Sequence, residues 1–275
     1  MPELPEVETT RRGIEPALVG KRLCGVVVRQ PQLRWPIPVK TLEKELVGQV
    51  IQQVARRAKY LLWRCPQGTL LVHLGMSGSL RIVPEHTPPA KHDHVDWVME
   101  GGQMVRLHDP RRFGAVVWIP VTSPEEEHPL LAKLGPEPLH RSLNGRYLHQ
   151  GSRGRQLAVK NYIMDQSVVV GVGNIYASEA LFRAGIAPAQ AAGKVGLGRY
   201  RALACAIKAV LGDSIEQGGT TLRDFIGSDG KPGYFVQSLN VYGRAGKACP
   251  KCGTTIEKQV LGQRSSYYCP QCQRA

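Results

Sequence analysis

Long apolar runs are absent from this sequence, and their absence excludes a large class of proteins. No stretch approaches the roughly 18 consecutive apolar residues that a membrane-spanning helix needs. No basic amphipathic helix suited to a membrane surface stands out either. The first residues are acidic and rich in proline, unlike a signal peptide. We therefore expect a cytoplasmic protein that does not bind membranes.

Acidic residues are scarce beside basic ones. The chain has 22 Asp and Glu against 36 Lys and Arg, which gives a formal net charge of +14 at pH 7. Such a balance favours a polyanionic partner, and with no membrane signal that partner is expected to be nucleic acid. The length of 275 residues suits two domains of ordinary size.

Cysteine is sparse outside the C-terminal segment. Cys24, Cys65 and Cys205 are isolated among apolar neighbours, which predicts buried free thiols. Two C-x-x-C pairs with sixteen residues between them have the spacing of a four-thiolate zinc site, and their members are Cys249, Cys252, Cys269 and Cys272. Two disulfides are the alternative. Four thiolates leave no open coordination position, so we expect one structural Zn²⁺ per chain and no organic cofactor.

The first residues offer a nucleophile. If Met1 is removed, Pro2 becomes the N-terminus, and its secondary amine can attack an electrophilic carbon and hold it as an iminium ion. An α-amine with a pKa near ~8 is deprotonated more readily than a lysine near ~10.4. Glu3 can supply the proton transfers that imine chemistry needs. The alternative is that Pro2 and Pro5 only stiffen the terminus before a helix.

The chain reads as an α+β multidomain protein with strands first and helices second. A helix is expected over Val7–Ala17, followed by an antiparallel β-sandwich or barrel. The expected strands are Val26–Val28, Tyr60–Trp63, Leu70–Leu74, Asp96–Met99 and Ala115–Ile119. Later helices are expected at Ile175–Ala184, capped by Asn174, and at Leu197–Ile215, with short strands at Gln259–Leu261 and Ser265–Tyr268. The predicted boundaries are 1–134 for the sandwich, 135–150 for a linker, 151–240 for the helical domain and 241–275 for the zinc finger.

Five motifs follow one another in a fixed order. They are Pro2-Glu3-Leu4-Pro5-Glu6-Val7-Glu8, His73-Leu74-Gly75-Met76-Ser77-Gly78, Asp109-Pro110-Arg111-Arg112-Phe113-Gly114, Gly171-Val172-Gly173-Asn174-Ile175-Tyr176 and the cysteine quartet. Together they resemble the bacterial formamidopyrimidine-DNA glycosylases over essentially the whole chain. The resemblance implies an N-terminal β-sandwich, a helical domain with a helix–two-turn–helix motif, and a zinc finger. It also implies a monomeric glycosylase and lyase acting on double-stranded DNA that contains an oxidised purine such as 8-oxoguanine.

The resemblance assigns catalytic and phosphate-binding roles. Pro2 attacks the sugar C1′ and expels the damaged base, Glu3 protonates the opening sugar ring, and β- and δ-elimination then cleave the strand. Lys59 and His73 contact phosphates, although a solvated charge run and a core histidine are the structural alternatives. Arg56 and Arg57 are expected on a solvated face. Glu6 either positions the base or a water molecule, or only caps the helix.

Further residues of the resemblance bind DNA. Met76, Arg111 and Phe113 fill the void left by the extruded base, although a Met and a Phe are more often core residues. Asn174 and Tyr176 lie at a helix start that can bind a phosphate. At the tip of the zinc hairpin, Arg264 grips the backbone beside the lesion. The remaining assignments are Lys160 near the damaged base and a loop over 218–234 that closes on the purine.

Two other functions compete with this interpretation. Endonuclease VIII has the same fold and prefers oxidised pyrimidines, but Leu4, Met76 and the turn carrying Arg111 and Phe113 favour the purine enzyme. A zinc-ribbon DNA-binding module without catalysis suits the charge and the cysteines equally. Such a module does not explain Pro2 followed by Glu3.

Overall fold

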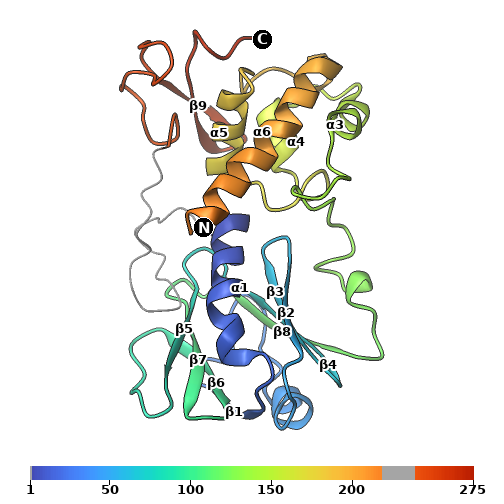
Figure 1. The fold of residues 1–275 in the computed structure, drawn as a ribbon, viewed down its shortest axis with the longest axis vertical. Helices are drawn as coiled ribbons and strands as arrows, with labels where there is room; N and C mark the ends of the chain where they lie inside the picture. The colour runs from blue at the N-terminus through green and yellow to red at the C-terminus, as the bar shows by residue number, and fades with distance from the viewer. Residues whose placement is uncertain (1, 219–238) are drawn as a thin grey trace. The chain divides into compact units, whose positions relative to one another are not determined.

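The computed structural model describes residues 2–218 and 239–275 (Figure 1). The described residues fall into two compact units, one made of residues 2–132 and 218 and the other of residues 133–217 and 239–275. Met1 and residues 219–234 of the expected purine-binding loop lie outside the described residues. Within the described part, no helix is both long and apolar enough to cross a membrane.

The first unit is a sandwich of two four-stranded antiparallel sheets, which confirms the expected architecture. One sheet has the order β1-β6-β7-β5 and the other the order β2-β3-β4-β8. The first comprises β1 (Leu23–Val28), β6 (Asp93–Met99), β7 (Gln103–His108) and β5 (Ser79–Pro84). The second comprises β2 (Gln53–Arg57), β3 (Tyr60–Cys65), β4 (Gly68–His73) and β8 (Ala115–Pro120). Two short helical turns, α2 (Val39–Thr41) and η1 (Leu42–Leu46), lie between β1 and β2, and a third, η2 (Glu125–Glu127), follows β8.

The core lies between the two sheets. Trp63 of β3 and Trp97 of β6 meet edge to face with ring centroids 4.9 Å apart, and both are fully buried. Helix α1 (Leu4–Leu18), blue in Figure 1, packs against β2 and β3 of one sheet and β5 and β7 of the other. The N-terminal segment is therefore held by both layers of the sandwich.

Helix α1 begins three residues earlier than the sequence indicated. Pro5 falls in its first turn, where the missing N–H of proline has no intrahelical acceptor to lose. Glu6 accepts a hydrogen bond from the Glu3 backbone N–H at 2.8 Å, and the Glu3 side chain accepts from the Glu6 N–H in return. This capping box moves the helix start next to Pro2.

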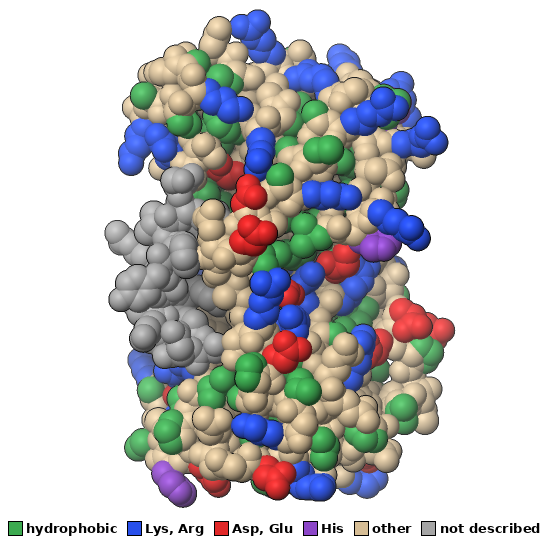
Figure 2. All heavy atoms as spheres, viewed as in Figure 1, with side chains coloured by type: hydrophobic (Ala, Val, Ile, Leu, Met, Phe, Trp, Pro, Cys, Tyr) green, Lys and Arg blue, Asp and Glu red, His purple; other side chains and the backbone are tan. Residues whose placement is uncertain are grey.

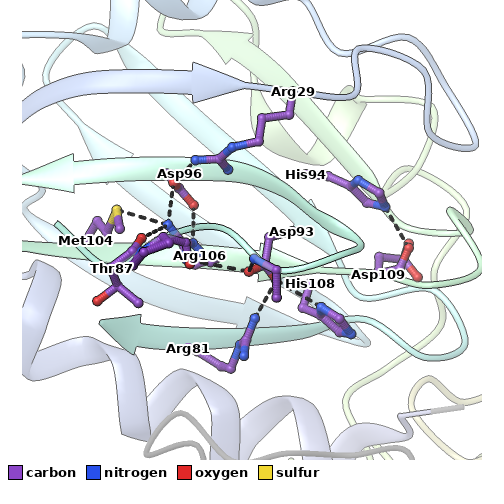
Figure 3. A network of polar contacts seen from close by, with 12 residues as sticks. Arg29, Arg81, Thr87, Asp93, His94, Asp96, Met104, Arg106, His108 and Asp109 are labelled. Carbon is purple, nitrogen blue, oxygen red and sulfur yellow. Dashed lines mark hydrogen bonds and ion pairs between the residues drawn. The ribbon is translucent and has the colours of Figure 1, made fainter. Parts of the chain in front are cut away.

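Strands β2, β5 and β7 were not expected from the sequence because charged residues interrupt their apolar pattern. In β7, Arg106 is 2% exposed and donates to both carboxylate oxygens of Asp96, at 2.7 and 2.9 Å (Figure 3). Arg29, directly after β1, also donates to Asp96. Burial alone would raise the pKa of Asp96, but its hydrogen bonds to Arg106 and Arg29 and their charges lower it overall. A buried ion pair with further hydrogen bonds replaces apolar residues on this side of the sheet.

The second unit is helical and ends in a hairpin. Its helices are α3 (Gly145–Ser152), α4 (Val159–Met164), α5 (Asn174–Arg183), η3 (Ala192–Lys194) and α6 (Leu197–Glu216). The hairpin consists of β9 (Glu257–Leu261) and β10 (Arg264–Tyr268), close to the expected strands. Helix α3 begins inside the segment 135–150 that was expected to be a linker and continues two residues beyond it. Cys24 and Cys205 are exposed, which corrects the expectation that they are buried, whereas Cys65 is buried and free.

Candidate functional site

The N-terminal end of α1 presents the expected catalytic pair. Pro2 is buried and Glu3 is 3% exposed. Glu6 is 4% exposed and is engaged in the capping box, so the structure confirms its capping role. The box fixes the backbone of Glu3, which directly follows Pro2. If Met1 is removed, a carboxylate and a secondary amine are held at adjacent positions.

The basic run before β3 is only partly a solvated face. Arg56 has a side chain that is 11% exposed, and its Nε donates to Oε2 of Glu8 at 3.0 Å. Burial raises the pKa of Glu8, but Arg11, Arg12 and Arg56 outweigh it and the pKa is lowered overall. This cluster joins β2 to α1 and corrects the expectation that Arg56 is solvated.

Lys59 and His73 lie close together at one end of the second sheet. Lys59 follows Ala58, which has a left-handed φ of 54°, in the turn joining β2 to β3, and is 7% exposed. His73 ends β4, pairs with Tyr60 in the sheet register, and stacks obliquely on the Tyr60 ring at 4.9 Å. Burial, together with the positive charges of Lys59 and Arg34, lowers the pKa of His73 to about 4.

His73 is therefore a neutral imidazole at pH 7. Its Nδ1 accepts a hydrogen bond from the Gly75 backbone N–H at 3.0 Å. The proton of the neutral ring consequently resides on Nε2, which makes His73 a neutral hydrogen-bond donor at that atom. A phosphate contact from this residue would be a hydrogen bond and not an ion pair.

The three expected void-filling residues lie on two neighbouring turns of the sandwich. Met76 is 37% exposed and Phe113 48% exposed, which contradicts the alternative that they are core residues. The Nη1 atom of Arg111 is 3.6 Å from Sδ of Met76. An adjoining cavity of 670 Å³ is lined by residues of both turns and by the segment 30–34. The two turns bring together two apolar side chains and one cationic hydrogen-bond donor.

Arg34 also belongs to this region, although it lies outside the five sequence motifs. Its guanidinium stacks over the Trp35 ring at 5.0 Å, and its backbone N–H donates to the Gly114 carbonyl at 3.3 Å. Its charge contributes to the low pKa of His73. A basic residue beside a tryptophan, in Gln32-Leu33-Arg34-Trp35, was the signal available in the sequence.

Asn174 does not cap α5 with its side chain, which corrects the expectation. The N-cap is Gly173, and Asn174 is the first helical residue. Oδ1 of Asn174 accepts from Nζ of Lys160 at 2.6 Å, and its Nδ2 donates to the Ser265 carbonyl at 3.0 Å. Asn174 therefore ties the start of α5 to the hairpin.

Lys160 and Tyr176 have buried side chains, which limits the roles that the sequence assigned to them. Lys160 is 0% exposed and donates to Ser266 Oγ at 2.7 Å, besides its bond to Asn174. Tyr176 is 1% exposed, and its hydroxyl is 2.6 Å from Ser214 Oγ. In this structure neither side chain is available at the surface to contact DNA.

Arg264 lies at the tip of the hairpin. Gly262 and Gln263 form the turn with φ values of 54° and 62°, and Arg264 directly after it is exposed. A Cβ atom on Gly262 would come within 2.3 Å of Asn161 Nδ2, so this turn is packed against the helical unit at α4. Glycine at position 262 suits the left-handed conformation of this turn, and a larger residue there would displace the Asn161 side chain.

The four cysteines of the C-terminal segment converge on one point. Their sulfur atoms lie within 4.8 Å of one another, with Cys249–Cys272 at 3.9 Å and Cys252–Cys269 at 3.5 Å. Tetrahedral zinc with Zn–S bonds of ~2.3 Å separates its sulfurs by about 3.8 Å. All seven cysteines are free thiols, so the disulfide alternative is wrong. The quartet fits one structural Zn²⁺.

Positive charge is concentrated in the second unit. Residues 133–217 and 239–275 contain 17 Lys and Arg against 6 Asp and Glu. Blue basic side chains are spread over the upper part of the face seen in Figure 2, with few red ones among them. A polyanion would bind such a surface with a strong dependence on salt.

Family models account for most of the chain. Residues 1–116 match the formamidopyrimidine-DNA glycosylase N-terminal domain, and residues 134–226 match the H2TH domain of that glycosylase. Residues 246–275 match the zinc finger found in FPG and IleRS.

Known proteins are similar to the chain along its full length. The formamidopyrimidine-DNA glycosylase of Syntrophotalea carbinolica is 61% identical over 274 residues, which cover 100% of both chains. The complex between Lactococcus lactis Fpg and an abasic-site-containing DNA has a TM-score of 0.90 and 31% identity, over 99% of this chain and 100% of that chain. A structure of MutM with carbocyclic 8-oxo-G containing DNA has a TM-score of 0.89 and 33% identity, over 100% of both chains.

Proposed function

The chain belongs to the formamidopyrimidine-DNA glycosylase family, and we propose that it excises oxidised purines from double-stranded DNA and then cleaves the strand. We propose that it acts as a monomer on DNA in the bacterial cytoplasm. The observation that carries the mechanism is the buried pair of Pro2 and Glu3 at the start of α1. Similarity to proteins solved with abasic-site DNA and with 8-oxo-G DNA supports the substrate class.

The proposed reaction begins at the amine of Pro2. Removal of Met1 exposes this amine, which forms a bond to C1′ as the bond from C1′ to the damaged base breaks. The proton of the attacking nitrogen is transferred to the departing base, which restores the nitrogen lone pair. The C1′–O4′ bond then breaks, Glu3 gives a proton to O4′, and the nitrogen lone pair forms the iminium. Glu3 is suited to this step because the capping box holds its backbone beside the amine.

Elimination completes the proposed reaction. The iminium acidifies the C2′ proton, whose loss expels the 3′-phosphate by β-elimination. A second, δ-elimination expels the 5′-phosphate, and hydrolysis of the iminium releases the sugar fragment and frees Pro2. These steps need acid–base groups at the N-terminus and no organic cofactor.

Both units are proposed to hold the DNA. Lys59 offers a cation and His73 a neutral Nε2–H donor to phosphates on the first unit. On the second, Arg264 and the backbone at Asn174 are proposed to bind the phosphates beside the lesion. Lys160 is proposed to act through Asn174 and the hairpin, because its own ammonium group is buried. The zinc would hold Arg264 in place and take no part in the chemistry.

The void left by the extruded base is proposed to be filled from the sandwich. Met76 and Phe113 are exposed apolar side chains suited to enter the base stack, and Arg111 is suited to hydrogen bond to the unpaired cytosine. We also propose that the sandwich domain spans residues 1–134, a linker 135–150, the helical domain 151–240 and the zinc finger 241–275.

Borohydride trapping on a duplex with one 8-oxoguanine opposite cytosine tests the function. We expect a covalent adduct on Pro2, identified by mass spectrometry of a peptide lacking Met1. Pro2→Gly should abolish trapping and retain duplex binding, while Glu3→Gln should slow ring opening and therefore formation of the trapped adduct. Trapping only with an oxidised pyrimidine would identify the pyrimidine-specific relative. No adduct with either lesion, despite duplex binding, would favour a DNA-binding module without catalysis.

A further inference from the structure

Asp109 is a fully buried carboxylate that joins the two turns carrying Met76, Arg111 and Phe113. Its exposure is 0%, and it lies directly after β7. Oδ1 accepts from Ser77 Oγ at 3.2 Å, and Oδ2 accepts from the Gly114 backbone N–H at 2.8 Å. One oxygen therefore binds the turn that carries Met76, and the other binds the turn that carries Phe113.

The backbone of Asp109 is equally engaged. Its N–H donates to the His92 carbonyl at 3.0 Å, and its carbonyl accepts from Arg112 N–H at 3.2 Å. The carbonyl also lies 2.8 Å from Nε2 of His94, which is 5% exposed (Figure 3). Strand β6 thus supports Asp109 from behind, so that its carboxylate is fixed relative to the sandwich.

The two turns also touch through their backbones. A Cβ atom on Gly75 would lie 2.4 Å from the carbonyl carbon of Phe113, and one on Gly114 would lie 2.9 Å from the His73 carbonyl oxygen. Gly75 has a φ of +64°, and Arg112 has a left-handed φ of 56°. A left-handed conformation at a residue other than glycine persists only where its surroundings hold it. The hydrogen bonds of Asp109 supply that support.

We propose that Asp109 is a positioning residue for base extrusion, which sets Met76 and the Arg111–Phe113 pair in one fixed arrangement through Ser77 and Gly114. This inference rests on the proposed function, because it concerns the side chains that replace the extruded base. Asp109 does not touch DNA and takes no part in the chemistry at Pro2. Its loss should therefore impair the removal of a stacked base much more than the cleavage of an existing abasic site, where no base has to be extruded.

Two substitutions at this position separate the contacts from the charge. Asp109→Ala removes both acceptors and leaves the buried Gly114 N–H without its partner. Asp109→Asn has almost the same shape, and it can accept from Gly114 N–H while its NH₂ donates to Ser77 Oγ. The asparagine variant should therefore rescue the function that alanine loses. Ser77→Ala removes one of the two links and provides a milder, independent test should Asp109→Ala fold poorly.

Glu125→Ala is the matched control. Glu125 accepts from Arg64 at 2.8 Å and from Thr69 Oγ1 at 2.6 Å. Thr69 lies at the start of β4, whereas His73 and the Met76 turn lie at its other end. The control therefore removes a comparable polar clamp from the same unit without touching the two turns.

Single-turnover rates on 8-oxoguanine opposite cytosine and on a preformed abasic site test the inference. We expect Asp109→Ala to slow base excision at least about ten-fold relative to abasic-site cleavage, because misplacement by about 1 Å carries a rate penalty of this order or more. For Asp109→Asn, the ratio of the base-excision rate to the abasic-site cleavage rate should stay within about three-fold of the wild-type ratio. The ratio for Ser77→Ala should lie between those of Asp109→Ala and Asp109→Asn, and the ratio for Glu125→Ala should equal that of wild type. The fluorescence of a 2-aminopurine placed beside the orphan cytosine should increase when the wild-type protein binds the duplex. The increase should be much smaller when Asp109→Ala binds.

The possible failures are distinguishable. An unchanged ratio of the two rates in both Asp109→Ala and Ser77→Ala, or the same altered ratio in Glu125→Ala, would overturn the positioning role. A wild-type enzyme inactive on both substrates would instead overturn the proposed function itself.

Discussion

The ammonium group of Lys160 lies 2.6 Å from the side-chain oxygen of Asn174, and both residues also hydrogen bond to the zinc-binding hairpin. Lys160 comes from α4 and Asn174 from the first turn of α5, while Ser265 and Ser266 belong to β10. The charged group is therefore a buried junction of three elements. Through it, the start of α5 and the hairpin tip with Arg264 keep a fixed relation.

Lys160→Met should destabilise the second unit. Methionine fills a similar volume but leaves Asn174 Oδ1 and Ser266 Oγ without their donor, which costs about 2–4 kcal/mol in the free energy of unfolding. Denaturant unfolding measures the loss, and hydrogen exchange at 265–268 locates it. The exposed Lys194→Met serves as the control. A change below about 0.5 kcal/mol for Lys160→Met would contradict the junction's role.

Removing the metal should loosen the hairpin and weaken DNA binding. Chelation at neutral pH is expected to release one zinc ion per chain, measured with a colorimetric indicator. Because Arg264 is presented by this hairpin, affinity for lesion-containing duplex should fall with zinc release and return when zinc is restored. Cys252→Ser should reproduce the loss, whereas Cys205→Ser should not. Unchanged affinity in the zinc-free protein would argue against Arg264 as a contact.

Glu179 should be a major anchor for the segment that precedes the zinc finger. Its carboxylate is 3% exposed and accepts from the backbone N–H groups of Asn240, Val241 and Tyr242, each at 2.9 Å. Glu179→Gln turns an amide NH₂ toward some of these donors and should cost about 1–3 kcal/mol of unfolding free energy. The exposed Glu216→Gln should cost far less in the same thermal or denaturant experiment. Equal stability of the two variants would refute the assignment.

His73 should make folding stability depend on pH in acid. Its folded pKa of about 4 lies below the ordinary value of 6.5, so the unfolded chain binds a proton more readily between these values. The stability contribution is complete above pH 6.5 and is lost as the pH falls toward 4, by at most roughly 3 kcal/mol. His73→Gln should flatten this part of the stability–pH curve, measured by denaturant unfolding between pH 4.5 and 7. An unaltered curve would show that His73 titrates normally.

Salt titrations should separate Lys59 from His73 as DNA contacts. Neutralising ~4–6 phosphates predicts a log–log slope of about −4 to −5 for the binding constant against salt concentration. Lys59→Met should reduce the magnitude of this slope by about one. His73→Gln should lower affinity with little change in slope, because the imidazole is neutral at pH 7. A slope near zero for the wild-type protein would exclude phosphate contacts altogether.

The sandwich was predictable where apolar residues alternate or cluster, as in β3, β4 and β8. Strands β2 and β7 were missed because Arg56 and Arg106 look like surface charges in the sequence. Their partners, Glu8 and Asp96, lie 48 and 10 residues away, and local patterns do not reveal such pairing. The start of α1 was placed too late because two prolines concealed the capping box of Glu3 and Glu6.

The zinc hairpin was predictable because its determinants are local, namely the cysteine spacing and the Gly262–Gln263 turn. The contacts of Asn174 were not predictable from the sequence, because its hydrogen-bond partners come from α4 and β10. Similarly, the motif containing Asp109 was recognised in the sequence. The link from its carboxylate to Ser77, 32 residues away, appears only when β5, β6 and β7 are assembled.

Two thiols make the chain suitable for labelling without further engineering. Cys24 lies in β1 of the first unit and Cys205 in α6 of the second, and both are exposed and free. Cys65 is buried, and zinc occupancy would protect the other four sulfurs from alkylation. A maleimide dye pair attached to the zinc-loaded protein would therefore place one fluorophore on each unit. Single-molecule energy transfer between them would report whether the distance between the two dyes changes when lesion-containing DNA is added.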